Sequence, residues 1–146
     1  SNFGGVKRRM ELLGTVRGVE VYDDFAHHPT AIDTTLEGAR KRLGERKLWA
    51  IIEPRSNTMR MGSHKDGLAH SARLADEVIW YQPEGLDWDL QPVIAAAPNK
   101  AVVARTLDDI IHTIVSDAGE GDAVVIMSNG GFGGLHQKLI SALNAE

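Results

Sequence analysis

Apolar positions along the chain follow two different periods, and the two periods alternate. Short runs that are continuously apolar, or that alternate with polar residues, are typical of strands, whereas apolar residues three and four apart are typical of one helix face. Five segments fit the strand pattern: residues 18–22, 48–52, 78–81, 101–104 and 123–127. The continuous runs at 48–52 and 123–127 indicate strands that are covered on both faces, as in a parallel sheet.

Four helices are predicted between and after these strands. The first begins at Pro29 and ends near Gly44, the second runs from Ser63 to about Leu74, Thr106 caps the third, and the last ends near Leu143. Residues 82–100 contain three prolines and are expected to be mostly irregular. The alternation predicts an α/β fold: a Rossmann-like, open, mostly parallel sheet flanked by helices in a single domain.

Composition limits the classes of function. With 146 residues, of which 42% are hydrophobic, the chain suits one domain with a real core. A net charge of −4 and the lack of a basic run longer than residues 7–9 argue against a nucleic-acid groove and against membrane-surface binding. The absence of cysteine excludes disulfides, a thiolate nucleophile and cysteine zinc sites. No segment resembles a signal peptide or a membrane span, so we expect a cytoplasmic protein.

Polar or glycine-rich segments directly follow three of the predicted strands. They are Asp23–Thr30, Glu53–Gly62 and Ser128–Gly134. Because the carboxyl ends of parallel strands lie at one edge of a sheet, and right-handed crossovers keep them there, these segments are expected to share one rim. Open α/β sheets bind ligands at that rim, so the sequence places the candidate site there.

The first of these segments contains two carboxylates and two imidazoles. His27 and His28 are either part of a helix-entry turn, with one exposed and one capping, or functional groups beside a ligand. A metal site is disfavoured because adjacent residues rarely both reach one ion and no second ligand motif supports them. Asp24 is either a carboxylate that favours the helix N-terminus or an acceptor for ribose hydroxyls or a metal-bound water.

The other two segments suit anions. Arg55 and Arg60 are either solvated or a clamp for carboxylates or phosphates, since a guanidinium pairs with planar anions through two hydrogen bonds. The glycines of residues 128–134 match neither the P-loop nor the dinucleotide motif. They form either a flexible turn or a place where a ligand approaches backbone N–H groups, which suits a carboxylate.

Four segments together resemble the C-terminal domain of the Mur ligases, in the right order and over nearly the whole chain. These segments are residues 3–11, 23–30, 53–60 and 128–134. The segment at 23–30 is shared with the muramate:alanine ligases, which remain an alternative. The segments at 53–60 and 128–134 point to the branch of the family that joins UDP-N-acetylmuramate to the tripeptide L-alanyl-γ-D-glutamyl-meso-diaminopimelate, in bacterial peptidoglycan recycling.

The resemblance implies an ATP-dependent amide ligation through an acyl phosphate. It also implies that a UDP-sugar domain and a central P-loop ATPase domain precede residues 1–146, with residues 1–10 leading from the central domain. ATP and Mg²⁺ would be bound mainly by that central domain, so the isolated chain is expected to be inactive. The implied partners are these domains, UDP-N-acetylmuramate and the tripeptide, with no nucleic acid and no membrane.

Residue roles follow from matched positions. The resemblance assigns Arg9 to the ATP phosphates and Asp24 to the ribose, and it places His27 beside the nucleotide and His28 beside the incoming amine. Both histidines are candidate catalytic residues, and no metal ligand is implied. The tripeptide carries three carboxylates, and the residues expected to hold it, by inference from their chemistry, are Arg55, Asn57, Arg60, Ser128, Asn129, Gly130 and Gly131. The Asp-Asn-Pro-Arg loop of the family's diaminopimelate-adding members is absent from this sequence.

Two other α/β modules compete with this interpretation. A phosphoreceiver domain also carries paired aspartates after an early strand, but it needs a phosphoacceptor aspartate at the end of a later one, where this chain has Glu53 and Tyr81. A dinucleotide-binding oxidoreductase domain needs its glycine-rich loop after the first strand, where this chain has His27, His28 and Pro29.

Overall fold

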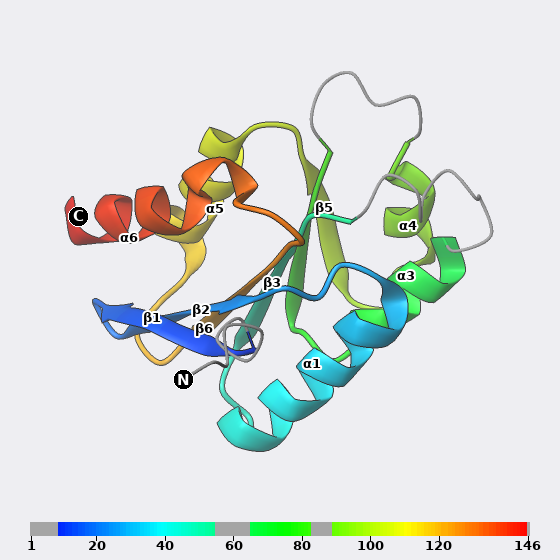
Figure 1. Ribbon diagram of the computed structural model, residues 1–146, viewed down its shortest axis with the longest axis horizontal. Helices are drawn as coiled ribbons and strands as arrows, with labels where there is room; N and C mark the ends of the chain where they lie inside the picture. The colour runs from blue at the N-terminus through cyan, green and yellow to red at the C-terminus, as the bar shows by residue number, and fades with distance from the viewer. Residues whose placement is uncertain (1–8, 55–64, 83–88, 146) are drawn as a thin grey trace.

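A single six-stranded sheet forms the centre of the computed structural model, which describes residues 9–54, 65–82 and 89–145 (Figure 1). The strands are β1 (Glu11–Val16), β2 (Val19–Asp24), β3 (Leu48–Ile52), β4 (Glu77–Tyr81), β5 (Lys100–Ala104) and β6 (Ala123–Met127). The helices are α1 (Pro29–Leu43), α3 (Lys65–Ser71), α4 (Gln91–Ala96), α5 (Leu107–Asp117), the short 3-10 helix η2 (Phe132–Gly134) and α6 (Leu135–Ala145). In the described part of the chain, no helix is long and apolar enough to cross a bilayer.

The strand order is β1-β2-β6-β3-β4-β5, and every neighbouring pair except β1 with β2 is parallel. The sheet grows from β3 through β4 to β5, and the chain then crosses back through α5 to insert β6 between β2 and β3. The predicted open, mostly parallel sheet in one α/β domain is confirmed. Its five predicted strands are all present.

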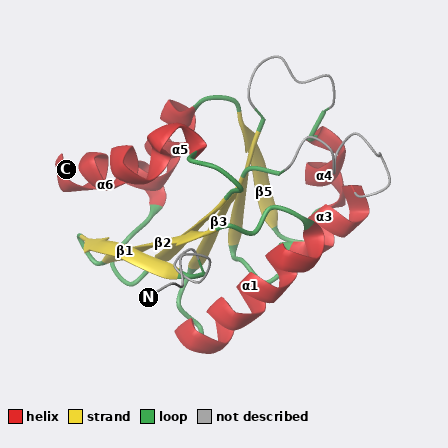
Figure 2. Cartoon of the chain, viewed as in Figure 1, coloured by secondary structure: helices red, strands yellow, loops and turns green. Residues whose placement is uncertain are grey.

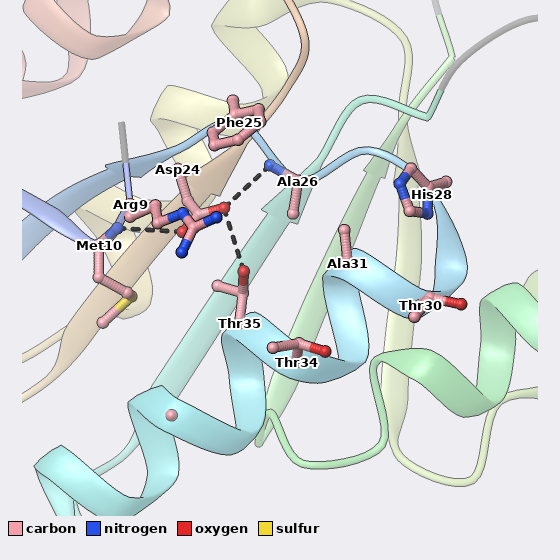
Figure 3. A pocket seen from close by; sticks show the side chains of 11 residues that line it. Arg9, Met10, Asp24, Phe25, Ala26, His28, Thr30, Ala31, Thr34 and Thr35 are labelled. Carbon is pink, nitrogen blue, oxygen red and sulfur yellow. Dashed lines mark hydrogen bonds between the residues drawn. The ribbon is translucent and has the colours of Figure 1, made fainter. Parts of the chain in front are cut away.

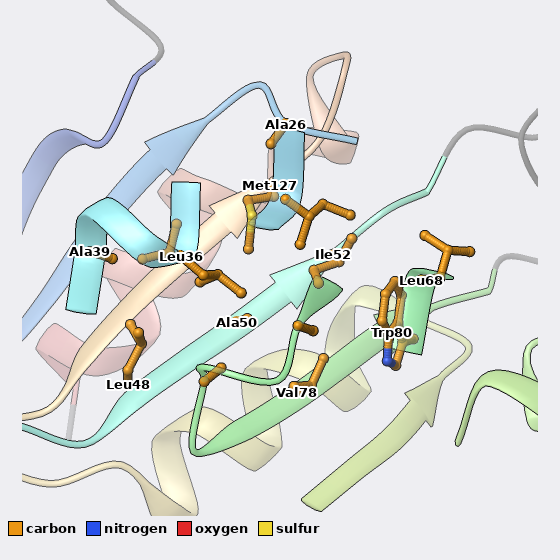
Figure 4. Packing of buried hydrophobic residues seen from close by; sticks show 14 of the residues in the cluster. Ala26, Leu36, Ala39, Leu48, Ala50, Ile52, Leu68, Val78, Trp80 and Met127 are labelled. Atoms are coloured by element: carbon orange, nitrogen blue, oxygen red, sulfur yellow. The ribbon is translucent and has the colours of Figure 1, made fainter. Parts of the chain in front are cut away.

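Helices cover both faces of the sheet (Figure 2). On one face α1, α3 and α4 pack over a core that includes Leu48, Ala50 and Ile52 of β3 (Figure 4). On the other face α5 and α6 cover Trp49 and Ile51 of the same strand. Successive residues of β3 therefore point into different cores. Because both faces of the strand are buried, its sequence is a continuous apolar run.

The best-predicted helices combine an apolar face with a fitting first residue. In α1, Pro29 occupies the first turn, where its missing N–H needs no partner, and the buried residues recur at helical spacing: Ile32, Leu36, Ala39 and Leu43. In α5, the Thr106 side chain accepts a hydrogen bond from the backbone N–H of Asp109 at 3.1 Å, as expected of an N-cap.

Three elements differ from the sequence-based expectation. β1 was not predicted, because it is an edge strand with two exposed first residues and a register shift between Leu12 and Gly14. The expectation of an irregular segment at 82–100 was wrong for α4, because Pro92 lies in the first turn of the helix and Val93 is buried. α3 ends at Ser71, three residues before the expected end, and Ser63 lies outside the described residues.

The turn between β1 and β2 depends on Gly18. Val16 pairs with Val19, so Arg17 and Gly18 form a two-residue hairpin turn with positive φ angles of 54° and 80°. A Cβ on Gly18 would lie 2.5 Å from Glu120 Cγ and 3.0 Å from Glu120 Cα. The close approach of the β1–β2 turn to the loop before β6 therefore requires glycine here.

We expect Gly18→Ala to lower the free energy of unfolding by at least about 1 kcal/mol, from the left-handed backbone alone. The contact with the Glu120 backbone should increase this loss. The matched control is Gly119→Ala, because a Cβ there meets nothing within 4 Å and its φ is not positive. Urea unfolding of both variants measures the difference, and equal stability of the two would contradict the role of Gly18.

Candidate functional site

The insertion of β6 between β2 and β3 brings the predicted rim segments together. At the carboxyl ends of these strands, the backbone N–H of Ser128 donates to Asp24 O at 3.1 Å. The N–H of Glu53 donates to Met127 O at 2.9 Å. The shared rim is thus confirmed for the segments that begin at Asp23 and Ser128, and for Glu53 and Pro54. Arg55, Asn57 and Arg60 lie outside the described residues.

The two aspartates that end β2 point to opposite faces of the sheet. Asp24 lies on the α1 face and is 4% exposed. Its Oδ1 accepts hydrogen bonds from Ala26 N at 2.9 Å and Thr35 Oγ1 at 3.1 Å, and its Oδ2 accepts one from Met10 N at 3.0 Å. Asp24 therefore ties the start of β1, the turn after β2 and helix α1 to one carboxylate.

Asp23 lies on the other face, against α6. Its Oδ1 lies 2.9 Å from Nε2 of His136, and both side chains are largely buried. His136 is in the first turn of α6, so this contact links β2 to the helix that follows the glycine-rich segment. The sequence does not predict this pair, because 113 residues separate the two positions and no local motif connects them.

A pocket of about 380 Å³ lies beside Asp24, between the start of β1 and α1 (Figure 3). Arg9 and Asp24 lie at one end of the view and His28 at the other, with Ala31, Thr34 and other α1 residues along one side. Arg9 is exposed. The structure therefore brings together three sequence-predicted residues, namely Arg9, Asp24 and His28, around one cavity.

The two histidines form the turn into α1. Neither acts as a side-chain cap: His28 occupies the N-cap position but makes no side-chain cap hydrogen bond, and His27 Nδ1 lies 2.7 Å from Phe25 O. Their rings meet edge to face with centroids 5.3 Å apart. His28 is exposed and lines the pocket, whereas His27 is partly buried and does not line it.

The glycine-rich segment turns sharply over the end of β6. Ser128 is fully buried, and its hydroxyl donates to Gly130 O at 2.9 Å. Asn129, Gly130 and Gly131 are exposed, and η2 follows with Phe132 buried beneath it. Of the predicted substrate residues in this segment, three therefore present their backbone to solvent and Ser128 shapes the turn from inside.

A row of side chains lies at the same rim, on the face of the sheet that α5 and α6 cover. Ile126, Ile51 and Ile79 lie side by side on β6, β3 and β4. Two residues farther along the chain come Ser128, Glu53 and Tyr81, of which Ser128 and Glu53 lie just past the ends of β6 and β3. They return to the same face because side chains alternate. The ring of Tyr81 packs against Phe132 with centroids 5.1 Å apart.

The pKa values of Glu53 and Tyr81 are both raised in this row. Burial raises the pKa of Glu53 above its usual value. Burial also raises the pKa of the Tyr81 phenol, and the nearby Glu53 charge raises it further. The sequence placed Glu53 at the rim but did not single it out, because only the strand register shows that it shares a face with Tyr81.

Within the described ranges, no three His, Asp or Glu side chains gather closely enough to hold a metal ion. Among the described residues, the rim offers the exposed guanidinium of Arg9, the hydrogen-bonded carboxylate of Asp24, the glycine-rich turn, and the partly buried carboxylate of Glu53 beside Tyr81. This set suits anionic and zwitterionic organic ligands.

Residues 8–130 match the family model described as "Mur ligase, glutamate ligase domain". The UDP-N-acetylmuramate–L-alanyl-γ-D-glutamyl-meso-2,6-diaminoheptandioate ligase of Escherichia coli K12 is 47% identical over 143 residues, which cover 97% of this chain and 31% of that protein. The chain thus spans about a third of the length of this relative.

Solved structures agree with this match. A murein peptide ligase from Psychrobacter arcticus superimposes with a TM-score of 0.91 and 56% identity, covering 100% of this chain and 32% of that one. A domain of a homologous ligase from Haemophilus ducreyi superimposes with a TM-score of 0.79 and 41% identity, covering 92% of this chain and 99% of that one. At 16% identity and a TM-score of 0.65, the MurF ligase of Thermotoga maritima, solved in complex with ADP, shares the fold over 94% of this chain and 30% of its own.

We expect Asp24→Ala to lower the free energy of unfolding by about 2 kcal/mol or more, because it removes the acceptor of three hydrogen bonds at a buried position. The control is Asp33→Ala, which removes a carboxylate paired with Arg73 at the surface of α1 and should cost no more than about 1 kcal/mol. Chemical unfolding at pH 7 compares the two, and a smaller loss for Asp24→Ala than for Asp33→Ala would argue against the anchoring role.

Glu53→Gln should change the pH dependence of stability. Because burial raises the pKa of Glu53, the folded chain keeps this proton to a higher pH than the unfolded chain does. Stability is therefore lost as the pH rises through the raised pKa, and the variant avoids that loss. The free energy of unfolding of the variant minus that of the parent chain should become more positive from pH 4 to pH 7.

The matched control for removing one negative charge is Glu45→Gln, at an exposed position near the opposite end of β3. Other titratable groups on the face of Glu53 include Tyr81, Asp23 and His136, and all remain in both variants. A difference for Glu53→Gln that does not change with pH would contradict the raised pKa.

Proposed function

The chain belongs to the Mur ligase family, and we propose that it is the C-terminal domain of an ATP-dependent ligase that joins UDP-N-acetylmuramate to L-alanyl-γ-D-glutamyl-meso-diaminopimelate. The observation that carries the proposal is the rim at which Asp24, Glu53 and the glycine-rich turn meet, in a chain 47% identical to a relative named for this reaction. We also propose that the UDP-sugar domain and the P-loop domain lie in the rest of the protein, and that the ligation takes place in the cytoplasm.

In the proposed reaction, ATP supplies the phosphoryl group that activates the muramate carboxylate as an acyl phosphate. The free alanyl amine then attacks the carbonyl carbon, the amide C–N bond forms, the amine loses a proton, and phosphate leaves. An acyl phosphate hydrolyses readily, so a domain that closes over the reacting groups and excludes water protects it. This domain would close over the central domain and carry the amino substrate to the acyl phosphate.

The pocket beside Asp24 is the proposed nucleotide contact. An ionised carboxylate can accept about four hydrogen bonds. Asp24 accepts three within the described residues, which leaves capacity for a ribose hydroxyl. The bond from Met10 N to Asp24 also fixes the backbone next to Arg9, so the exposed guanidinium is presented at the same pocket, where phosphate oxygens can pair with it.

ATP is therefore proposed as the nucleotide, a choice supported by the ADP complex of a distant structural relative. Mg²⁺ would travel with the phosphates, on the central domain, since the described residues of this chain offer no carboxylate cluster. Of the two histidines, only His28 lines this pocket. From their matched positions in the family, we propose that His27 is on the nucleotide side and His28 on the side of the incoming amine once the domains have closed.

The glycine-rich turn is the proposed contact for the peptide carboxylates. The exposed backbone of Asn129, Gly130 and Gly131 offers N–H groups to an anion, and the buried hydroxyl of Ser128 holds the turn through Gly130 O. Arg55, Asn57 and Arg60, which follow β3 in the sequence, are proposed to complete this contact.

The proposal is tested by Arg9→Ala in the full-length ligase. We expect apparent ATP affinity to fall about tenfold or more, the usual consequence of losing a charged hydrogen bond, while UDP-N-acetylmuramate binding is unchanged. The control is Arg105→Ala, which removes an exposed guanidinium after β5, the opposite edge strand. Steady-state kinetics with varied ATP measures both variants, and unchanged ATP dependence in Arg9→Ala would remove this pocket from the nucleotide site.

A further inference from the structure

Glu53 lacks a counter-charge among the described residues. None of the ion pairs between described residues includes Glu53, and burial raises its pKa. The other acid on this face, Asp23, has His136 beside it. The hydroxyl of Ser128, the neighbour of Glu53 in the row, donates to Gly130 O instead. A partly buried carboxylate that is not compensated within the fold costs stability, and a bound cation would offset that cost.

The groups around Glu53 also favour a cation. Tyr81 shares its row, and Phe132 packs on Tyr81 with an interplanar angle of 41°. Aromatic ring faces attract cations through their quadrupole, and the attraction adds to that of a carboxylate. An anionic ligand group would instead be repelled at this position, and a neutral apolar group would leave the carboxylate desolvated without a partner.

The neighbouring glycine-rich turn suits an anionic group instead of a cation. Ser128 lies in the same row as Glu53, and residues 129–131 follow it directly in the chain. The backbone N–H groups of these exposed residues suit a carboxylate. A ligand with an ammonium and a carboxylate on the same carbon atom would therefore satisfy both parts at once. In the tripeptide, only the free end of diaminopimelate has this zwitterionic structure, because the alanyl amine carries no carboxylate on its carbon.

We propose that Glu53, beside Tyr81, binds the ammonium group at the zwitterionic end of the peptide substrate, and so selects peptides that carry it. This rests on the proposed function, because it assigns a further contact to the same substrate. It makes Glu53 a specificity-determining residue and separates its task from that of Asp24, which lies on the other face of the sheet.

The test is calorimetric titration of this chain with two peptides. One is L-alanyl-γ-D-glutamyl-meso-diaminopimelate, and the other replaces the distal ammonium by hydrogen and keeps the distal carboxylate. We expect the parent chain to bind the first peptide about tenfold or more tightly than the second, as for loss of a charged contact. Glu53→Gln should bind both peptides with the same, weaker affinity, and Glu45→Gln should behave as the parent chain.

A third peptide, acetylated on the alanyl nitrogen, distinguishes the two ammonium groups of the substrate. If acetylation weakens binding to the parent chain and Glu53→Gln abolishes that difference, Glu53 binds the reacting amine and the proposal is overturned. If Glu53→Gln still prefers the diaminopimelate peptide as strongly as the parent chain does, the proposal is also overturned, while the proposed function stands. If the parent chain binds none of the peptides at millimolar concentration, both the inference and the peptide-presenting role fail.

Discussion

The position of β6 between β2 and β3 is the constraint on which the rest of this structure depends. Along the chain β2 and β3 come early, with α1 between them, and the last strand, β6, lies between β2 and β3 in the sheet. Two backbone hydrogen bonds at the carboxyl ends, from Ser128 N to Asp24 O and from Glu53 N to Met127 O, then fix three loop segments side by side. The candidate contacts at Asp24, Glu53 and Ser128 lie at one rim because β6 occupies this position.

The alternation of side chains along the strands divides the rim into two sides. Asp24 faces α1 and organises the pocket that includes Arg9, whereas Glu53 and Tyr81 face α5 and α6. In the proposed ligase, nucleotide and amino substrate would thus approach one edge of the sheet from different faces. The acyl phosphate, which reacts with both, would lie between them, and a single closing motion could bring the two sides onto the central domain.

Much of this arrangement is predictable from the sequence, and the failures have physical causes. Continuous apolar runs identified β3 and β6 because both faces of each strand are buried, and Pro29 identified the start of α1. β1 was not predicted because an exposed, bulged edge strand has little apolar pattern. α4 was not predicted because Pro92 was taken as a helix breaker. The contact of Asp23 with His136 and the pairing of Glu53 with Tyr81 depend on strand register, which no local pattern encodes.

The most direct test of the account is to follow the backbone amides of the isotope-labelled chain by NMR during titration with the tripeptide. The account predicts that the shifted signals cluster at Glu53, Tyr81 and residues 128–134, with little change at the β1–β2 turn around Gly18, at the other end of the sheet. Shifts confined to that turn, or no shifts at millimolar peptide, where binding of about 4 kcal/mol would be detected, would contradict the claim that this rim presents the amino substrate.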